Sequence, residues 1–174
     1  MEKIKDEKLT DLLNVIISRK CAPKRMTNIR IFVRPPLGFR SILGLASYGV
    51  KSNTIWLSHL LLPQYNNSRG DMTMLVSVSL HEVAHIICDV SASGEEHNAG
   101  WWKVMASFGL YPVSPEGRLD GSKANLKLKR FPKYIVNLFM GYGCPYESLC
   151  PKGFDDRQIQ FFRDNGQLVK DFLD

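Results

Sequence analysis

The 174-residue chain has few cysteines and no long apolar run. Its four cysteines form no CxxC pair, which disfavours a disulfide scaffold and fits a reducing compartment. No stretch approaches the ~18 consecutive apolar residues of a membrane span, and the start, MEKIKDEKLTDLL, lacks the apolar core of a signal peptide. The sequence therefore predicts a soluble, intracellular protein that is cytoplasmic, or nuclear in a eukaryote, and not secreted.

Acidic residues are absent between Leu12 and Gly70, although this stretch carries nine basic residues. Residues 1–70 have a net charge of +8, residues 71–116 of −5 and residues 117–174 of +3. Such an uneven distribution suggests a surface for a polyanion. A solvated basic face is the alternative, and the sequence leaves both open.

Apolar residues make up 44% of the chain, enough for the core of one globular domain. Hydrophobic periodicity, turn residues and helix-stop signals divide the chain into expected elements. Helices are expected at 5–19, 71–90, 101–109 and 155–172. Strands are expected at 28–34, 44–50, 54–58 and 133–140, with the second and third forming a hairpin. The segment 141–153 is expected to be a loop, and the predicted fold class is α+β.

The segment HEVAH, residues 81–85, carries the clearest chemistry. His81 and His85 are one helical turn apart, so both imidazoles project from one face and can bind a tetrahedral Zn²⁺. Glu82 is displaced by about 100° around the helix, which puts it beside the metal as a base rather than as a ligand. The residues around the motif are uncharged, as a helix that buries its metal-bearing face requires.

Zinc in a site of this kind needs a third protein ligand. Cys88 lies on the same helix face but about 10 Å along the axis from His81, too far to share the ion. Glu95 and Glu96 are carboxylate candidates, whereas His97 offers an imidazole after a loop long enough to turn the chain back. Ligand chemistry favours His97, and the two glutamates remain alternatives.

The segment that begins at His97 carries a family resemblance. HNAGWWKVMASFGLYP starts after eleven residues that follow His85, and it resembles the second zinc-binding segment of the SprT-like metallopeptidases. The matching residues are His97, Trp101, Met105, Gly109 and Pro112. The upstream segment ASYGVKSNTIWLSHLLL is similar to the strand and turn that lead into that family's catalytic helix. The resemblance covers roughly residues 40–112.

The resemblance implies a zincin-like metallopeptidase domain, in which a small β-sheet from residues 28–58 packs on the HExxH helix. It implies one Zn²⁺ bound by His81, His85 and His97, with Glu82 as the catalytic base for peptide-bond hydrolysis. In zincins a sheet strand forms the edge of the cleft, so a protein substrate is expected to bind extended, by strand addition. The family includes Spartan, which cleaves proteins crosslinked to DNA, so DNA is an expected partner.

Two features depart from the family pattern. Asn98 replaces the usual glycine after the third histidine, a mild change because asparagine tolerates unusual backbone angles. Many SprT-like proteins also carry a four-cysteine zinc ribbon at the C-terminus, where this chain has only Cys144 and Cys150. We therefore expect a catalytic domain over 1–116 and a basic extension over 117–174, either a metal-free remnant of the ribbon or an unrelated segment.

Two basic stretches with aromatic residues are candidates for DNA contact, because phosphate neutralisation combined with base stacking holds single strands. The first lies on the outward face of the strand at 28–34, and the second lies near 123–134. A buried Phe32 with arginines reaching to solvent, and a flexible basic linker, are the alternatives. The candidate residues are Arg30, Phe32, Arg34, Lys127, Lys129 and Arg130.

Two other functions stay open. Peptidases of the ImmA/IrrE type also use HExxH and take a third ligand from a glutamate in a Glu-x-x-Ala-Asn-like segment. Glu96 and Ala99 fit that spacing, but Gly100 stands where the asparagine should be. A DNA-binding module with a non-catalytic metal site is the third candidate, against which the intact Glu82 argues.

Overall fold

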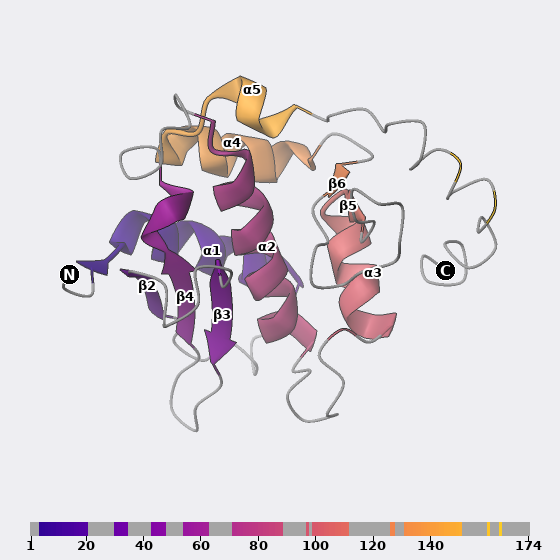
Figure 1. Cartoon of the computed structure of the whole chain (residues 1–174), viewed down its shortest axis with the longest axis horizontal. Coiled ribbons are helices and arrows are strands. Elements are labelled where there is room, and N and C mark those ends of the chain that lie inside the picture. The colour runs from indigo at the N-terminus through magenta and orange to yellow at the C-terminus, as the bar shows by residue number, and fades with distance from the viewer. Residues whose placement is uncertain are drawn as a thin grey trace.

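The structure is a computed structural model that describes residues 4–20, 30–34, 43–47, 54–62, 71–88, 97, 99–111, 126–127, 131–150, 160 and 164. In this part of the chain helices are mixed with two small sheets, in agreement with the predicted α+β class (Figure 1). The strands are β1 (Ile4–Lys5), β2 (Arg30–Arg34), β3 (Gly44–Ser47), β4 (Thr54–Ser58), β5 (Leu110–Tyr111) and β6 (Leu126–Lys127). The helices are α1 (Glu7–Lys20), the short 3-10 helix η2 (His59–Leu61), α2 (Thr73–Cys88), α3 (Ala99–Ser107), α4 (Lys133–Tyr142) and α5 (Tyr146–Leu149).

The larger sheet has the strand order β1-β2-β4-β3. β1 pairs antiparallel with β2, β2 pairs parallel with β4, and β3 pairs antiparallel with β4. The expected strand at 28–34 is confirmed over 30–34, and the expected hairpin is confirmed as β3 and β4. Among the described strands β3 has a single neighbour, so its outer side is an edge of the sheet.

Helix α1 closes one side of the core, as its apolar spacing predicts. Leu9, Leu13 and Ile16 are fully buried, and they recur at intervals of three and four residues, which places them on one helix face. Asp6 caps the helix, because its Oδ1 accepts the Leu9 N–H at 2.8 Å. α1 contacts α2, α4 and β2 and so joins the sheet to the helical part of the molecule.

Helix α2 lies at the centre of the molecule, between the sheet and α3 (Figure 1). Eleven of its sixteen residues are buried, which explains its nearly uninterrupted apolar sequence. Its start agrees with the prediction near Asp71, whose Oδ1 accepts the Thr73 N–H at 2.8 Å. β3 and β4 contact one side of α2, and α3 contacts another. The helix therefore presents the HEVAH segment between two packed elements.

The prediction of a strand at 133–140 is wrong, because these residues belong to α4. Ile135 and Phe139 are fully buried and one turn apart, a helical period that the short apolar run concealed. Gly143 adopts the left-handed conformation with φ 118°, and the Cys144 N–H donates to the Phe139 carbonyl at 2.9 Å. This is the Schellman arrangement that ends helices.

The prediction of a loop at 141–153 is wrong in part, because 141–142 complete α4 and 146–149 form α5. Ser148 of α5 anchors the start of α2, since its Oγ accepts the Met72 N–H at 2.9 Å. Of the helix expected at 155–172, Gln160 and Asp164 are described and both are helical.

Part of the expected C-terminal extension packs into the main core. Side chains from 131–149 belong to the same buried cluster as those of α1, α2 and α3. They are Phe131, Ile135, Phe139, Cys144 and Leu149. Cys88, Cys144 and Cys150 are not joined in disulfides. None of the helices in the described part of the chain has the length and apolar character of a membrane span.

Candidate metal centre

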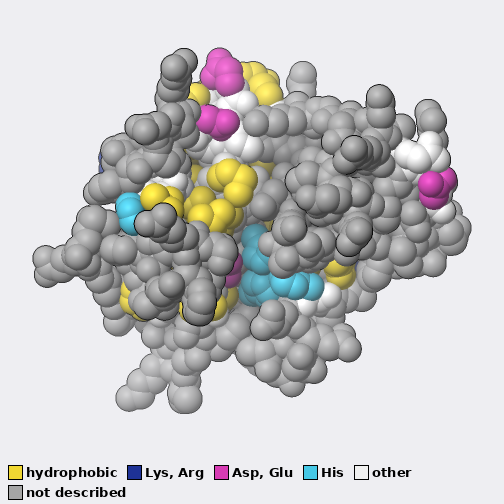
Figure 2. All heavy atoms as spheres, viewed as in Figure 1, with side chains coloured by type: hydrophobic (Ala, Val, Ile, Leu, Met, Phe, Trp, Pro, Cys, Tyr) yellow, Lys and Arg dark blue, Asp and Glu magenta, His cyan; other side chains and the backbone are white. Residues whose placement is uncertain are grey.

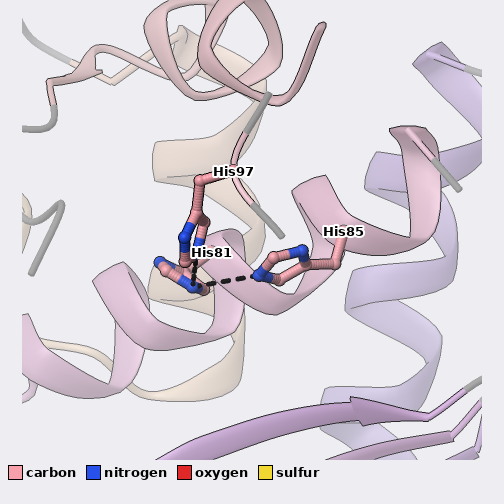
Figure 3. Close-up of side chains that lie close together, drawn as sticks. All are labelled: His81, His85 and His97. Carbon is pink, nitrogen blue, oxygen red and sulfur yellow. Dashed lines mark hydrogen bonds between the residues drawn. The ribbon is translucent and has the colours of Figure 1, made fainter. Parts of the chain in front are cut away.

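Three histidines from two helical regions meet at one point (Figure 3). His81 and His85 project from the same face of α2, as their spacing predicts, and His97 precedes α3. The Nε2 atom of His81 lies 3.2 Å from Nε2 of His85 and 3.3 Å from Nε2 of His97. One ligand atom from each residue lies within 4.8 Å of the others. Within the described residues this is the one group of three such side chains.

Hydrogen bonding accounts poorly for this arrangement. A ring nitrogen of a neutral imidazole carries either a hydrogen or a lone pair, so His81 Nε2 cannot be well satisfied by two nitrogens at once. A shared cation instead uses a lone pair from each ring. Zinc with bonds of about 2.0–2.1 Å in tetrahedral geometry places its ligand atoms about 3.3 Å apart. The separations of 3.2 and 3.3 Å from His81 Nε2 match that spacing, and the ligand atoms of His85 and His97 lie within 4.8 Å of each other.

The environment keeps two of these rings neutral, the form that binds metals. Burial, together with the nearby His85 and His97, lowers the pKa of His81 from 6.5 to about 3. Burial and then His97 lower the pKa of His85 to about 4. At neutral pH both imidazoles therefore keep a lone pair available for an ion.

Trp101 forms a wall against all three histidines. The indole is fully buried, and its ring centroid lies 4.8 Å from that of His81, 5.5 Å from His85 and 4.5 Å from His97. Trp102 holds the third histidine from its backbone, because its Nε1 donates to the His97 carbonyl at 3.0 Å. Packing against a rigid ring restricts the rotation of the imidazoles. The sequence predicted Trp101 only as a helix residue and family match; its position four residues after His97 was the available signal.

Glu82 lies on the sheet side of α2, against the edge strand β3. Its side chain is 6% exposed, and its carboxylate accepts a hydrogen bond from the Ala46 backbone N–H. Burial raises the pKa of Glu82 from 4.5 to about 8, although the Ala46 bond acts in the opposite direction. A carboxyl group with a pKa near the working pH is suited to general acid and base chemistry. The sequence did not indicate that β3 is the strand that contacts Glu82.

The histidines are accessible from one face of the molecule. Figure 2 shows histidine side chains gathered in a recess near the middle of this face, with an acidic side chain beside them. All three histidines are half-buried. A metal held here would thus keep a route to solvent, as a catalytic site requires.

Several predicted site residues fall outside what the structure describes. Glu95 and Glu96, the alternative third ligands, lie outside the described residues, as do Lys129 and Arg130. For Arg30, Phe32, Arg34 and Lys127 the backbone is described within β2 and β6, and their side chains are not. The DNA contacts therefore stay a prediction. No protein-family model, curated protein or solved structure matches this chain.

Proposed function

We propose that this protein is a zinc-dependent endopeptidase of the SprT-like type, with a zincin-like fold. The observation that carries the proposal is the meeting of three imidazoles, with ligand atoms within 4.8 Å of one another, close to a buried glutamate on the same helix. His81, His85 and His97 would hold the ion, and Glu82 would serve as the base. A purely structural zinc site has no use for such a glutamate, and it normally closes all four positions with protein ligands.

When bound, Zn²⁺ supplies Lewis acidity that lowers the pKa of a coordinated water to roughly 7 and polarises a substrate carbonyl. The residues of the chain do the remaining work. Glu82 accepts the proton from the attacking water at a carboxylate oxygen and then passes it to the nitrogen of the leaving amine. Burial beside β3 excludes bulk water from this carboxylate, so its proton transfers are directed to the reacting groups.

The edge strand β3 supports an extended peptide as the substrate. β3 contacts α2, and the strand order leaves its outer side without a neighbour among the described strands. A free strand edge is a template for backbone hydrogen bonding with another chain. A peptide added along β3 would pass the histidines and Glu82.

The substrate class that we propose is proteins bound or crosslinked to DNA. Its support is the sequence: the family resemblance, and the acid-free stretch from 12 to 70 together with the bases of 123–134. Phosphate contacts by such residues would make binding depend steeply on salt. Charge reversal of Lys127, Lys129 and Arg130 should weaken DNA binding and leave zinc content unchanged. Undetectable binding at low ionic strength, to single-stranded and double-stranded DNA alike, would remove DNA from the proposal.

Digestion of casein tests the proposed activity. The purified protein is expected to contain one zinc per chain, to cleave casein, to stop when the zinc is chelated and to recover when zinc is restored. Addition of single-stranded DNA should increase the rate if DNA is the partner. A protein that binds zinc but cleaves neither casein nor histones, with or without DNA, would contradict the peptidase assignment and favour a non-catalytic metal site.

The identity of the third metal ligand distinguishes the ImmA/IrrE-type peptidase from the SprT-like type. The proximity of His97 to His81 favours a three-histidine site over one completed by Glu96. His97→Ala is expected to lose zinc, and Glu96→Ala is expected to keep it. The opposite pair of results would move the protein to the ImmA/IrrE type.

A further inference from the structure

The backbone of β3 is arranged so that alternate residues face the side of the strand that has no neighbour among the described strands. The Ser58 N–H donates to the Leu43 carbonyl at 2.8 Å, and the register continues as Gly44↔Leu57, Leu45↔Trp56 and Ala46↔Ile55. In antiparallel pairs, hydrogen-bonded and non-bonded residues alternate along the strand. Leu45 therefore directs its N–H at β4, whereas Gly44 and Ala46 direct their backbone groups away from it.

Glu82 occupies part of this edge. Its carboxylate accepts a hydrogen bond from the Ala46 N–H, which points away from β4. Gly44 gives the space for it. A Cβ atom added at Gly44 would lie 2.5 Å from Glu82 Oε1, 2.9 Å from Glu82 Cγ and 2.7 Å from Val78 Cγ1. Any side chain at position 44 would have to displace the side chains of Glu82 and Val78.

We propose that Gly44 and Ala46 are positioning residues for Glu82: the glycine leaves the space that the carboxylate fills, and the Ala46 N–H fixes its orientation. The role in catalysis rests on the proposed function, but the contact itself does not. A long glutamate side chain has several rotamers, and a fixed donor on a paired strand selects among them. A base held in one place at the sheet edge can meet a proton at a defined distance, and a displacement of 1 Å can cost about 10²-fold in rate.

Amide hydrogen exchange of the ¹⁵N-labelled, metal-free protein tests the contact without any activity measurement. Because the Ala46 N–H points away from β4 and no described strand pairs with it, it should exchange rapidly unless Glu82 protects it. We expect Ala46 to be protected in the unmodified protein, and Glu82→Ala to reduce this protection at least tenfold. The Leu45 amide, which points at β4, should keep its protection and serves as the internal control. Rapid exchange of Ala46 in the unmodified protein would overturn the inference, whatever the variant does.

Cleavage measurements then test the role. Ala46→Pro removes the N–H, and proline is tolerated on an edge strand where the N–H faces outward. Gly44→Ala fills the space that Glu82 uses. Both variants should lower kcat for casein at least tenfold with full zinc content and little change in KM. Val15→Ala alters an exposed side chain of α1, away from β3 and the histidines, and should keep the parent kcat.

The outcomes separate this inference from the proposed function. If the unmodified protein binds zinc but cleaves nothing, the proposed function fails and the exchange result still decides the contact. If it cleaves casein while both variants keep the parent kcat, the positioning role is wrong and the peptidase assignment stands. If a variant loses its zinc or its fold, the other variant and the exchange of Ala46 in the unmodified protein decide the matter.

Discussion

Two carboxylates, Asp6 and Glu82, differ in their burial and in the number of hydrogen bonds that they accept. Asp6 is half-buried at the start of α1, where one oxygen accepts the Leu9 N–H at 2.8 Å and the other accepts the Tyr142 hydroxyl at 2.7 Å. Glu82 is 6% exposed in the middle of α2, and its carboxylate accepts a hydrogen bond from the Ala46 N–H. This bond lowers the pKa of Glu82, whereas burial raises it. Asp6 ties α1 to α4, whereas Glu82 faces the edge of a sheet beside three histidines.

The difference shows how a structural carboxylate is distinguished from one available for chemistry. Each oxygen of Asp6 accepts a hydrogen bond, and these two bonds offset the cost of removing the carboxylate from water. Glu82 has less compensation, so burial raises its pKa to about 8. Burial of such a carboxylate costs free energy on folding, and a buried acid with a shifted pKa is a candidate for a functional residue. The following predictions test this contrast.

The largest expected effect is the loss of cleavage in Glu82→Gln. Glutamine keeps the shape and an acceptor for the Ala46 N–H but cannot take the proton, so the rate should fall by about 10² to 10⁴. Zinc content should not change, since Glu82 is not a ligand in this account. The measurement is casein cleavage beside metal analysis of the same sample. Unchanged cleavage would place Glu82 in the same structural category as Asp6.

Removal of the metal should destabilise the helices around the histidines, α2 and α3, more than α1 and α4, which Asp6 joins. A ligand that binds only the folded state stabilises it by about 4 kcal/mol when its free concentration is 1,000 times Kd. Chelation should therefore lower the unfolding midpoint and speed amide exchange in the last turns of α2 and in α3. The amides of α1 and α4 should lose less protection. An equal loss of amide protection in all these helices would show that the stability of α2 and α3 does not depend on the metal more than that of α1 and α4.

Asp6→Ala should affect stability alone. It removes a helix cap and leaves the hydroxyl of the half-buried Tyr142 without its acceptor, which should cost about 1–3 kcal/mol in the free energy of unfolding. Tyr142→Phe removes the hydroxyl itself, so it should cost less, about 1 kcal/mol. Urea unfolding measures both. Zinc content and kcat should match the parent protein, and a change in either would weaken the division between the two carboxylates.

The smallest effect is a dependence of stability on pH in the metal-free protein. The pKa of Glu82 is raised from 4.5 to about 8, so its contribution to stability is complete below pH 4.5 and is lost as the pH rises through 8. His81 and His85 have lowered pKa values, so their contributions are complete above pH 6.5 and are lost as the pH falls toward 4.

Between pH 6.5 and 8 the histidine contributions are therefore constant while that of Glu82 declines. Unfolding free energy should fall by on the order of 1–2 kcal/mol over this range, and Glu82→Gln should remove the slope. Urea titrations of the two metal-free proteins at several pH values provide the comparison. Parallel slopes in the two proteins would mean that Glu82 is not the group responsible.

The histidine half of the site was predictable because its signals are local. His81 and His85 lie four residues apart on one helix, so helix geometry alone places their rings together. His97 needed the resemblance and ligand chemistry, since a loop separates it from α2. The hairpin of β3 and β4 and the apolar face of α1 also follow from patterns within a few residues.

The rest depends on packing between distant segments. Nothing near Glu82 in the sequence indicates that Gly44 and Ala46 surround its carboxylate, because that contact joins β3 to α2. The misassigned α4 has the same cause: its apolar residues fit either period, and the burial of Ile135 and Phe139 against the core selects the helix. Gly143 was a stop signal available in the sequence, and more weight on it would have predicted the helix end.

X-ray absorption at the zinc edge of the purified protein tests the central claim most directly. The account predicts one zinc per chain with three imidazole nitrogens and one oxygen from water, all at about 2.0–2.1 Å, because catalytic sites keep a position for solvent. A signal from sulfur at about 2.3 Å, two imidazoles with a protein carboxylate, or a protein that takes up no zinc would contradict it.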